Sequence, residues 1–299
     1  MKKISSMEFL KGLAEYGMRE RYGELPDPLT RLRLECELEH IKAADNAGLY
    51  VMAFWIFKHI ADVRYKIAVW PRGAMASSMV CYCLGITDID PIRYGLHSAR
   101  FVNREKPKFQ FDIDGNNYNQ FMKRADAALQ ANAELLDPDL GRECLLGDIQ
   151  PMSNMGKSLE KPLPADLDDE IAGYALSFPQ TMGLYETYLL RKNGDEWTPT
   201  GIKAVDDILA PTYGILVYQE QMFDILKTEF RITGIKANQI RLAIQRGDAQ
   251  SMEQYRNELM VEAKALNVSQ FDTIWEILTS NPKAFLKAHA VSRVLSRYQ

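Results

Sequence analysis

The chain has 299 residues, of which 46% are hydrophobic and 25% charged, and its formal net charge is −4. These proportions are ordinary for a globular protein with a substantial core, in one large domain or two of average size. The charge excludes a global basic field of the kind that marks many nucleic-acid binders, although a local basic patch would be enough to bind nucleic acid.

The cysteines and the N-terminus bear on the cellular compartment. None of the four cysteines (Cys36, Cys81, Cys83 and Cys144) forms a CxxC pair, and the spacing of Cys81 and Cys83 is poor for a metal site, so we expect buried thiols in a reducing compartment. The basic N-terminus leads into no apolar stretch of signal length, and no run reaches the roughly 18 apolar residues of a membrane span. We therefore expect a cytoplasmic protein with no membrane partner.

Helical periodicity dominates the chain, with two short β-type runs in the first half. A helix is predicted where Pro28 and Thr30 precede Leu34, Leu38 and Ile41 at helical spacing. The first half is then predicted to contain a buried helix at 48–60, an apolar β-type run at 67–73, a helix at 74–84, a strand at 109–113 and a helix at 119–136.

The second half is predicted to be helical throughout. A proline-rich stretch at 136–169 indicates a connecting region. Helical patterns follow at 170–192, 216–230, 236–247, 250–266, 270–280 and 284–298. The expected fold class is α+β, mostly helical, with one domain over residues 1–136 and a second, helical domain over residues 137–299.

Two carboxylates two residues apart are the first candidate site. Asp112 and Asp114 lie in the predicted strand, so their side chains point to the same face, about 7 Å apart. They repel each other unless cations or bases pair with them. This arrangement can hold two Mg²⁺ ions for in-line phosphoryl transfer, and a solvated strand end is the alternative.

Two further segments have phosphate-binding character. Pro71-Arg72-Gly73 forms a tight turn before a predicted helix, whose first N–H groups can bind a phosphate, although most such turns bind nothing. Residues 279–299 carry four basic side chains and no acid, and Arg293 and Arg297 are like-charged i,i+4 neighbours. A phosphate partner and a solvated helix face are both consistent with that pattern.

Four segments carry a family resemblance through their wording and their order: 68–103 (AVWPRGAMASSMVCYCLGITDIDPIRYGLHSARFVN), 109–114 (FQFDID), 211–221 (PTYGILVYQEQ) and 285–299. They resemble, in turn, a palm segment that runs from GPGRGSAAGSLVAY to LGITDIDPL, the aspartate strand PDFDVD, the fingers motif ETYGIIVYQEQ and the segment FNKSH…SYQ. These motifs belong to the C family of DNA polymerases, the bacterial DNA polymerase III alpha subunits. The resemblance covers about 67–114 and 147–299, and residues 8–60 resemble the approach to the palm.

The resemblance implies a reduced palm of the polymerase-beta-like nucleotidyltransferase fold followed by helical fingers. It implies template-directed DNA synthesis, in which two Mg²⁺ ions help a primer 3′-hydroxyl attack a dNTP. The implied catalytic and metal-binding residues are Asp112 and Asp114. The implied nucleotide-binding residues are Arg72, Gly73, Ala74, Arg241, Lys287 and His289. The implied partners are primer–template DNA, a dNTP and another replication protein.

The departures from the family pattern put catalysis in doubt. Ala74 stands where the family has serine, Gln110 replaces an acid, and Phe178-Pro179-Gln180-Thr181 replaces Arg-Pro-Gly-Pro. Only residues 115–149 separate the aspartate strand from the next matching segment, where the family has a thumb and a second palm strand with a third aspartate. The PHP, clamp-binding and OB-fold regions are also expected to be absent. Candidates for a third carboxylate are Asp126, Glu134, Asp137 and Asp139.

Three interpretations follow. The chain is a minimal DNA polymerase, completed by another chain; or a non-catalytic remnant that binds DNA, nucleotide or a replisome partner; or a decoy or inhibitor of a host polymerase. Its compactness suggests a phage or mobile-element gene. A third carboxylate beside Asp112 and Asp114 would favour the enzyme, and arginine or lysine partners for these aspartates would favour the binding protein.

Overall fold

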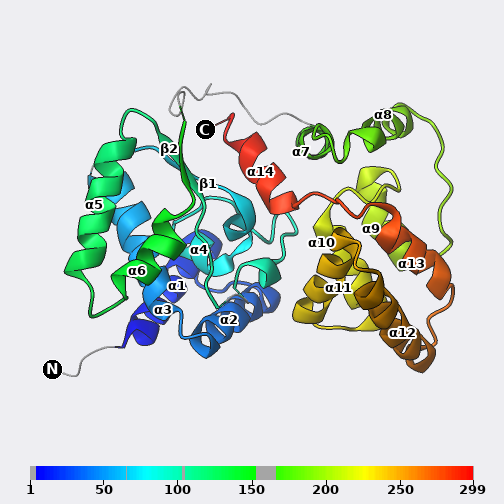
Figure 1. The fold of residues 1–299 in the computed structure, drawn as a ribbon, viewed down its shortest axis with the longest axis horizontal. Helices are drawn as coiled ribbons and strands as arrows, with labels where there is room; N and C mark the ends of the chain where they lie inside the picture. Colours follow the sequence, from blue (N-terminus) through cyan, green and yellow to red (C-terminus); the bar gives the residue numbers. More distant parts are fainter. Residues whose placement is uncertain (1–4, 65, 103–104, 153–165, 299) are drawn as a thin grey trace. The chain divides into compact units, whose positions relative to one another are not determined.

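The computed structural model describes residues 5–64, 66–102, 105–152 and 166–298, and it divides into two compact units. The first unit comprises residues 1–162 and 291–299, and the second comprises 163–290 (Figure 1). The predicted fold class, α+β and mostly helical, is confirmed. The predicted domain boundary after residue 136 stays a prediction, and the structure places the strand at 149–152 in the sheet of the first unit.

The first unit is built mainly of helices whose starts are encoded locally. Ser5 and Glu8 form a capping box at the first helix, and Asp27 caps the second, which has Pro28 at its first position. The helices are α1 (Ser6–Tyr22), α2 (Pro28–Ala43), α3 (Ala47–Ala53), a π-helix (Phe54–Arg64), 3₁₀ helices (Gly73–Ser77 and Ser98–Arg100), α4 (Met79–Cys83), α5 (Tyr118–Ala131), α6 (Pro138–Gly141), a second π-helix (Arg142–Leu146) and the end of α14 (Lys287–Leu295).

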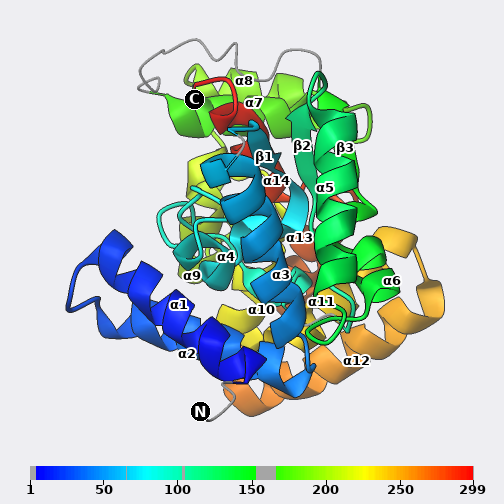
Figure 2. The same ribbon diagram turned by 90° about the vertical axis from the view of Figure 1, so that its left-hand side faces the viewer.

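A three-stranded sheet positions the candidate aspartates. Its strands are β1 (Val69–Pro71), β2 (Phe111–Asp114) and β3 (Ile149–Met152), in the order β1–β2–β3, with β1 antiparallel and β3 parallel to β2. Side chains alternate along a strand, so Phe111 and Ile113 enter the core while Asp112 and Asp114 point to the other face. Figures 1 and 2 show α3 and α5 beside this sheet.

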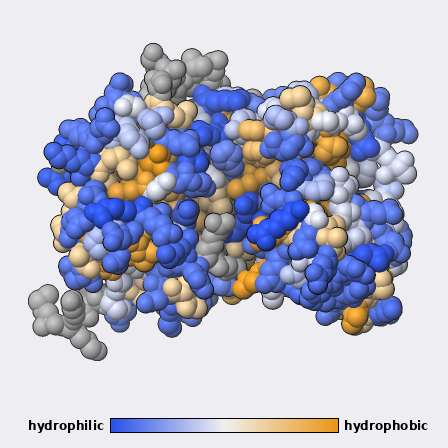
Figure 3. Space-filling view, viewed as in Figure 1, coloured by the Kyte–Doolittle hydropathy of each residue, from blue (hydrophilic) through white to orange (hydrophobic). Residues whose placement is uncertain are grey.

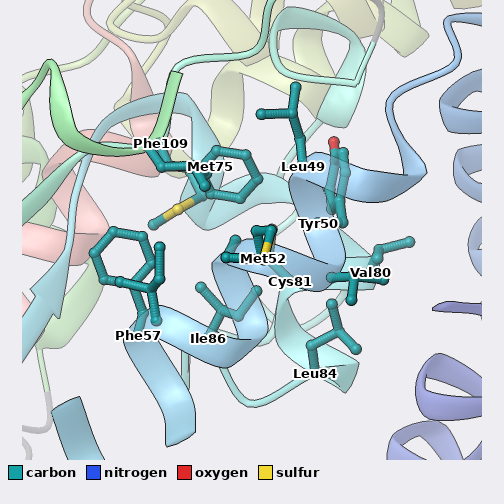
Figure 4. Packing of buried hydrophobic residues seen from close by; sticks show 14 of the residues in the cluster. Leu49, Tyr50, Met52, Phe57, Met75, Val80, Cys81, Leu84, Ile86 and Phe109 are labelled. Atoms are coloured by element: carbon teal, nitrogen blue, oxygen red, sulfur yellow. The ribbon is translucent and has the colours of Figure 1, made fainter. Parts of the chain in front are cut away.

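An aromatic stack joins the sheet to the helices. The centroid of the Phe57 ring in the π-helix lies 3.7 Å from the centroid of the Phe111 ring in β2 and 5.8 Å from the centroid of the Phe121 ring in α5. Figure 4 shows the neighbouring part of the core, where side chains from α3, α4 and the 3₁₀ helix converge. Each such fully buried side chain contributes about 1.5–3 kcal/mol, so the core fixes β2 firmly.

The end of α1 holds the LGITDIDP segment in place. The guanidinium of Arg21 lies 4.0 Å from the centroid of the Tyr82 ring and donates a 2.9 Å hydrogen bond to Asp88. The Tyr22 hydroxyl donates a 2.6 Å hydrogen bond to Asp90. Both aspartates of this motif therefore have structural partners in the first unit.

A buried carboxylate begins helix α4. Glu37 is 1% exposed, and it accepts hydrogen bonds from the Ser78 hydroxyl at 2.8 Å and from the backbone N–H groups of Met79 at 3.0 Å and Val80 at 3.2 Å. The Arg33 Nε donates to the same carboxylate at 2.7 Å. Glu37 thus satisfies the first donors of α4, which have no partner within a helix.

The second unit is helical. Its helices are α7 (Leu167–Leu176), a 3₁₀ helix (Met182–Leu184), α8 (Tyr185–Lys192), α9 (Lys203–Leu209), a 3₁₀ helix (Ala210–Thr212), α10 (Gln219–Phe230), α11 (Gly234–Arg246), α12 (Ala249–Leu266), α13 (Phe271–Ser280) and α14 up to Ala290. A parallel β-bridge between Tyr218 and Phe285 ties the QEQ motif to the segment before α14.

Some predicted elements differ from the structure. The single helix predicted at 74–84 is wrong: Ser78 has an extended backbone and caps α4, so a 3₁₀ helix precedes a short α-helix. The buried helix predicted at 48–60 changes from α to π at Phe54. The region predicted to connect the domains contains α6 and β3, and its residues 153–165 lie outside the described residues.

Neither the surface nor the helix lengths of the described residues point to a membrane span. Figure 3 shows hydrophobic residues in small separate patches among hydrophilic ones. Among the helices that the structure describes, none is long and apolar enough to cross a membrane.

Replacing Glu37 with alanine is expected to destabilise the first unit by about 3 kcal/mol or more, because Arg33 and the N–H groups of Met79 and Val80 lose a buried anionic partner. Thermal unfolding followed by circular dichroism would measure this. The matched control is Glu39→Ala on the exposed face of the same helix, expected within about 0.5 kcal/mol of the wild type. Equal effects of the two substitutions would contradict the assigned role of Glu37.

Candidate functional site

Asp112 is the most buried of the predicted site residues. It lies on the central strand β2, opposite Trp70 of β1 and Gln150 of β3, and is 0% exposed. Both of its carboxylate oxygens face guanidinium groups. Arg293 donates a hydrogen bond to Oδ2, and the Nε of Arg72 lies 3.2 Å from Oδ1 at an angle that forms an ion pair without a hydrogen bond.

Arg72 connects Asp112 to a second carboxylate, Asp148, at the start of β3. Its terminal nitrogen donates to the Asp148 side chain and, at 3.1 Å, to the Asp148 carbonyl. Gln110 donates from its amide to the other carboxylate oxygen of Asp148. The predicted phosphate ligand Arg72 is therefore 7% exposed and occupied by two acids of its own chain.

The end of α14 is fixed against the sheet by the residue before Arg293. The Ser292 hydroxyl donates to the carbonyl of Pro71, and the Trp70 indole N–H donates to the Ser292 carbonyl at 2.8 Å. These bonds place the Arg293 guanidinium on Asp112. The basic C-terminal pattern suggested a phosphate partner for Arg293, and the structure shows a carboxylate in that place.

The cluster is electrically balanced. Two carboxylates, Asp112 and Asp148, meet two guanidiniums, those of Arg72 and Arg293, so their formal charges cancel. Burial raises the pKa of the Asp112 carboxyl, and the two guanidinium groups oppose that rise. Burial also acts to raise the pKa of Asp148, but hydrogen bonds from Gln110 and Arg72 outweigh it and lower that pKa below its ordinary value.

Asp114 has local partners. It lies partly exposed at the end of β2, and its carboxylate accepts hydrogen bonds from the backbone N–H of Asn116 at 3.2 Å and the side-chain amide of Asn117 at 2.6 Å. Asp114 thus also ends the strand by organising the turn that follows it.

The predicted phosphate cradle is filled by the protein itself. Gly73 has a φ of +70°, and a side chain there would overlap the amide of Gln110, which lies directly over it. Ala74 packs its methyl group against the hydrophobic core. The N–H groups at the start of α4 donate to Glu37 instead of being open to an anion.

The residues that the structure describes do not fit a two-metal centre as the sheet is arranged. No group of three or more His, Cys, Asp or Glu side chains that could hold a metal ion occurs among them. Two Mg²⁺ ions would also add four positive charges beside the guanidiniums of Arg72 and Arg293, which would repel them strongly at these distances.

The four acids considered as a third metal ligand lie elsewhere in the first unit: Asp126, Glu134, Asp137 and Asp139. Arg142 pairs with Asp126 at 2.6 Å and with Asp139 at 2.7 Å, and Asp137 caps α6. Glu134 is exposed.

Three predicted nucleotide-binding residues lie in the second unit. Lys287 and His289 are partly exposed in the first turn of α14, and the Lys287 Nζ lies 5.5 Å from the centroid of the Tyr218 ring. Glu220, 3% exposed, accepts hydrogen bonds from the N–H of Lys287 at 2.8 Å and of Ala288 at 3.1 Å. The glutamate of the YQEQ motif thus satisfies the start of α14.

Arg241 is buried on α11, 3% exposed. Its guanidinium donates to the side-chain oxygens of Asn238 at 3.1 Å and of Gln245 at 2.7 Å. Lys283 donates to the Gln245 carbonyl, so Arg241 belongs to a network that ties α11 to the segment after α13.

Comparison with known families identifies both units. The model of the bacterial DNA polymerase III alpha NTPase domain matches residues 8–126, and the model of the bacterial DNA polymerase III alpha subunit finger domain matches residues 151–267. The chain belongs to the bacterial DNA polymerase III alpha family. The family resemblance predicted from the four sequence segments is thereby confirmed.

Individual members of this family share about a third of their residues with the matched part of the chain. The DNA polymerase III subunit alpha of Treponema pallidum is 33% identical over 167 residues, which are 54% of this chain and 14% of that protein. The Helicobacter pylori protein of the same name is 31% identical over 160 residues, 52% of this chain and 13% of that protein. The error-prone DNA polymerase of Anaeromyxobacter sp. is 38% identical over 103 residues, 34% of this chain and 9% of that protein.

Sequence reasoning missed the residues that complete the Asp112 cluster. Asp148 lay in the region treated as a connection, and Ser292 carries no motif of its own. Trp70 stood within a matched segment without an assigned role, and Arg293 was considered for a phosphate partner and not for a carboxylate. The only local signal was the excess of positive charge at 279–299, which indicated some anionic partner without identifying it.

The lowered pKa of Asp148 makes the cluster sensitive to acid. Because the folded state favours the charged carboxylate, its stabilising contribution is present above the ordinary aspartate pKa of about 4 and is lost as pH falls through the lower, folded-state pKa. Asp148→Asn should therefore lower the melting temperature at pH 7, and its difference from the wild type should shrink by pH 3. A difference that stays constant or grows on acidification would contradict this account.

Proposed function

We propose that this member of the DNA polymerase III alpha family is a DNA replication protein that binds DNA without itself catalysing nucleotidyl transfer. The observation that carries the proposal is the pairing of Asp112 with Arg72 and Arg293. At the position that corresponds to the family's metal centre, the negative charge of Asp112 is thus neutralised by arginine side chains of the same chain.

The state of the phosphate cradle supports the same function. Gln110 covers Gly73, Ala74 offers no hydroxyl, and Arg72 is bound to Asp148. The donors that would bind a triphosphate are thus satisfied internally, and breaking such buried contacts is costly. DNA is therefore a better-supported ligand than a free dNTP.

The names of the relatives suggest that this chain has a protein partner. The proteins of Treponema pallidum and Helicobacter pylori are both named as subunits. We include in the proposal that another replication protein binds this chain.

A second candidate function is metal-dependent DNA synthesis. One observation favours it: the buried Oδ1 of Asp112 has no hydrogen-bond donor, and Asp114 lies two residues further along the same strand. A cation that displaced Arg293 would meet Oδ2 and, beside it, the Oδ1 that is paired with Arg72 without a hydrogen bond. Mg²⁺ is the cofactor that the family resemblance implies for such a site.

Primer extension distinguishes the two functions. We expect the wild type to extend a primer no more than a protein-free control, with Mg²⁺ or with Mn²⁺, because Asp112 is paired with arginine and the described residues contain no group of three or more side chains that could hold a metal ion. The double variant Asp112→Ala/Asp114→Ala should behave in the same way. Extension by the wild type that disappears in the double variant would establish the polymerase instead.

An Arg293→Gln variant tests whether activity is merely masked. It frees Oδ2 of Asp112 while Ser292 and Trp70 still hold the end of α14. We expect no extension from this variant either. Primer extension that appears only in Arg293→Gln would indicate an inhibited polymerase and would overturn the proposed non-catalytic function.

A further inference from the structure

Polar side chains anchor helix α8 to the rest of the second unit. Its buried residue, Tyr188, donates a 2.6 Å hydrogen bond from its hydroxyl to Asp169 of α7. Arg191 donates to the carbonyl of Tyr213 at 2.9 Å, and the Nζ of Lys192 lies 2.9 Å from the Asp169 carboxylate. These three side chains of α8 are three and four positions apart, so they share one face of the helix. Figures 1 and 2 show α8 beside α7.

A second face of α8, together with the 3₁₀ turn before it, is apolar and exposed. Four large side chains, here called the α8 face, are between 37% and 54% exposed: Met182, Tyr185, Leu189 and Leu190. Spacings of three and four residues place them together on one side of the helix. A helix normally buries such a stripe, and apolar side chains that gather on a surface mark sites of protein–protein interaction.

One acid lies among these apolar side chains. Glu186 is exposed, and it follows Met182 by four residues and precedes Leu189 and Leu190 by three and four. The basic side chains of the same helix belong to its anchored face. The α8 face therefore combines an apolar surface with one negative charge near its middle.

This charge distinguishes between the possible occupants of the α8 face. A second copy of the chain that paired with it across a two-fold axis would bring the two Glu186 carboxylates together, and like charges at an interface are unfavourable. A helix of another protein with a lysine or arginine within its apolar stripe would place opposite charges together instead. Charge complementarity therefore favours a different protein over a second copy.

We propose that the α8 face binds an amphipathic helix of another protein, with a basic side chain of that helix beside Glu186. The proposal rests on the protein partner included in the function proposed above, and it assigns the surface and the chemistry of that contact. The four apolar side chains supply affinity through the area that they bury, and Glu186 selects for the basic side chain.

Fluorescence anisotropy with two labelled synthetic peptides tests the proposal. Each peptide is a helix of three heptads with leucine at the first and fourth positions of each heptad. The first leucine of the second heptad is replaced by lysine in one peptide and by glutamate in the other. The wild type should bind the lysine peptide about tenfold more tightly than the glutamate peptide. Glu186→Lys should reverse this preference, because it reverses the charge in the middle of the α8 face.

A double variant, Leu189→Gln with Leu190→Gln, removes apolar surface from the α8 face and keeps a high helix propensity. It should weaken the binding of the lysine peptide about tenfold. The matched control is Ile235→Gln with Val261→Gln, which changes two exposed apolar residues of the second unit outside the α8 face. The control should bind like the wild type, and thermal melting should verify that each variant is folded.

Equal affinity of the wild type for the two peptides, or no binding of either, would overturn the proposal. A wild-type dimer in sedimentation that the Leu189→Gln/Leu190→Gln variant does not form would also overturn it, since the occupant would then be a second copy. Anisotropy of a labelled primer–template duplex, measured with the same preparations, reports the proposed DNA binding separately. If the duplex binds and the peptides do not, the α8 face is wrong and DNA binding stands. If neither binds, both proposals are wrong.

Discussion

A carboxylate with no exposure to water must be paired, and the arrangement of the first unit follows from that requirement at Asp112. The residue lies on the central strand of a three-stranded sheet, on the face opposite the aromatic core. Arg72 reaches it from the end of β1 and Arg293 from α14. Asp148 pairs with the guanidinium of Arg72 and balances its charge. Two carboxylates and two guanidiniums from four separate segments therefore hold one another in place.

The same principle recurs at two helix starts. Glu37 satisfies the first N–H groups of α4, and Glu220 satisfies those of α14. In both places a buried side chain of the protein occupies a position that an anionic ligand could otherwise take. In the first unit Gln110 adds to this by covering Gly73. Positions that the family resemblance assigns to catalysis and to the nucleotide therefore contribute to the stability of this chain.

The sequence predicted those parts of the structure that depend on local pattern. The start of α2, the shared face of Asp112 and Asp114 and most helices of the second unit follow from spacing and caps. The pairing of Asp112 with Arg293 joins residues 181 positions apart, and nothing local encodes it. The strand β3 was missed because a short segment that contains a proline resembles a loop until its neighbour is known. The break at Ser78 was missed because the acid that caps α4 comes from another helix.

In this structure the partners of Asp112 are arginine side chains and not a divalent cation. The most direct measurement is anomalous X-ray diffraction from crystals of the full chain grown with Mn²⁺ in excess. We expect the guanidinium of Arg293 on Asp112 and no manganese peak between Asp112 and Asp114. A manganese peak at that position, with Arg293 turned away from the carboxylate, would contradict it.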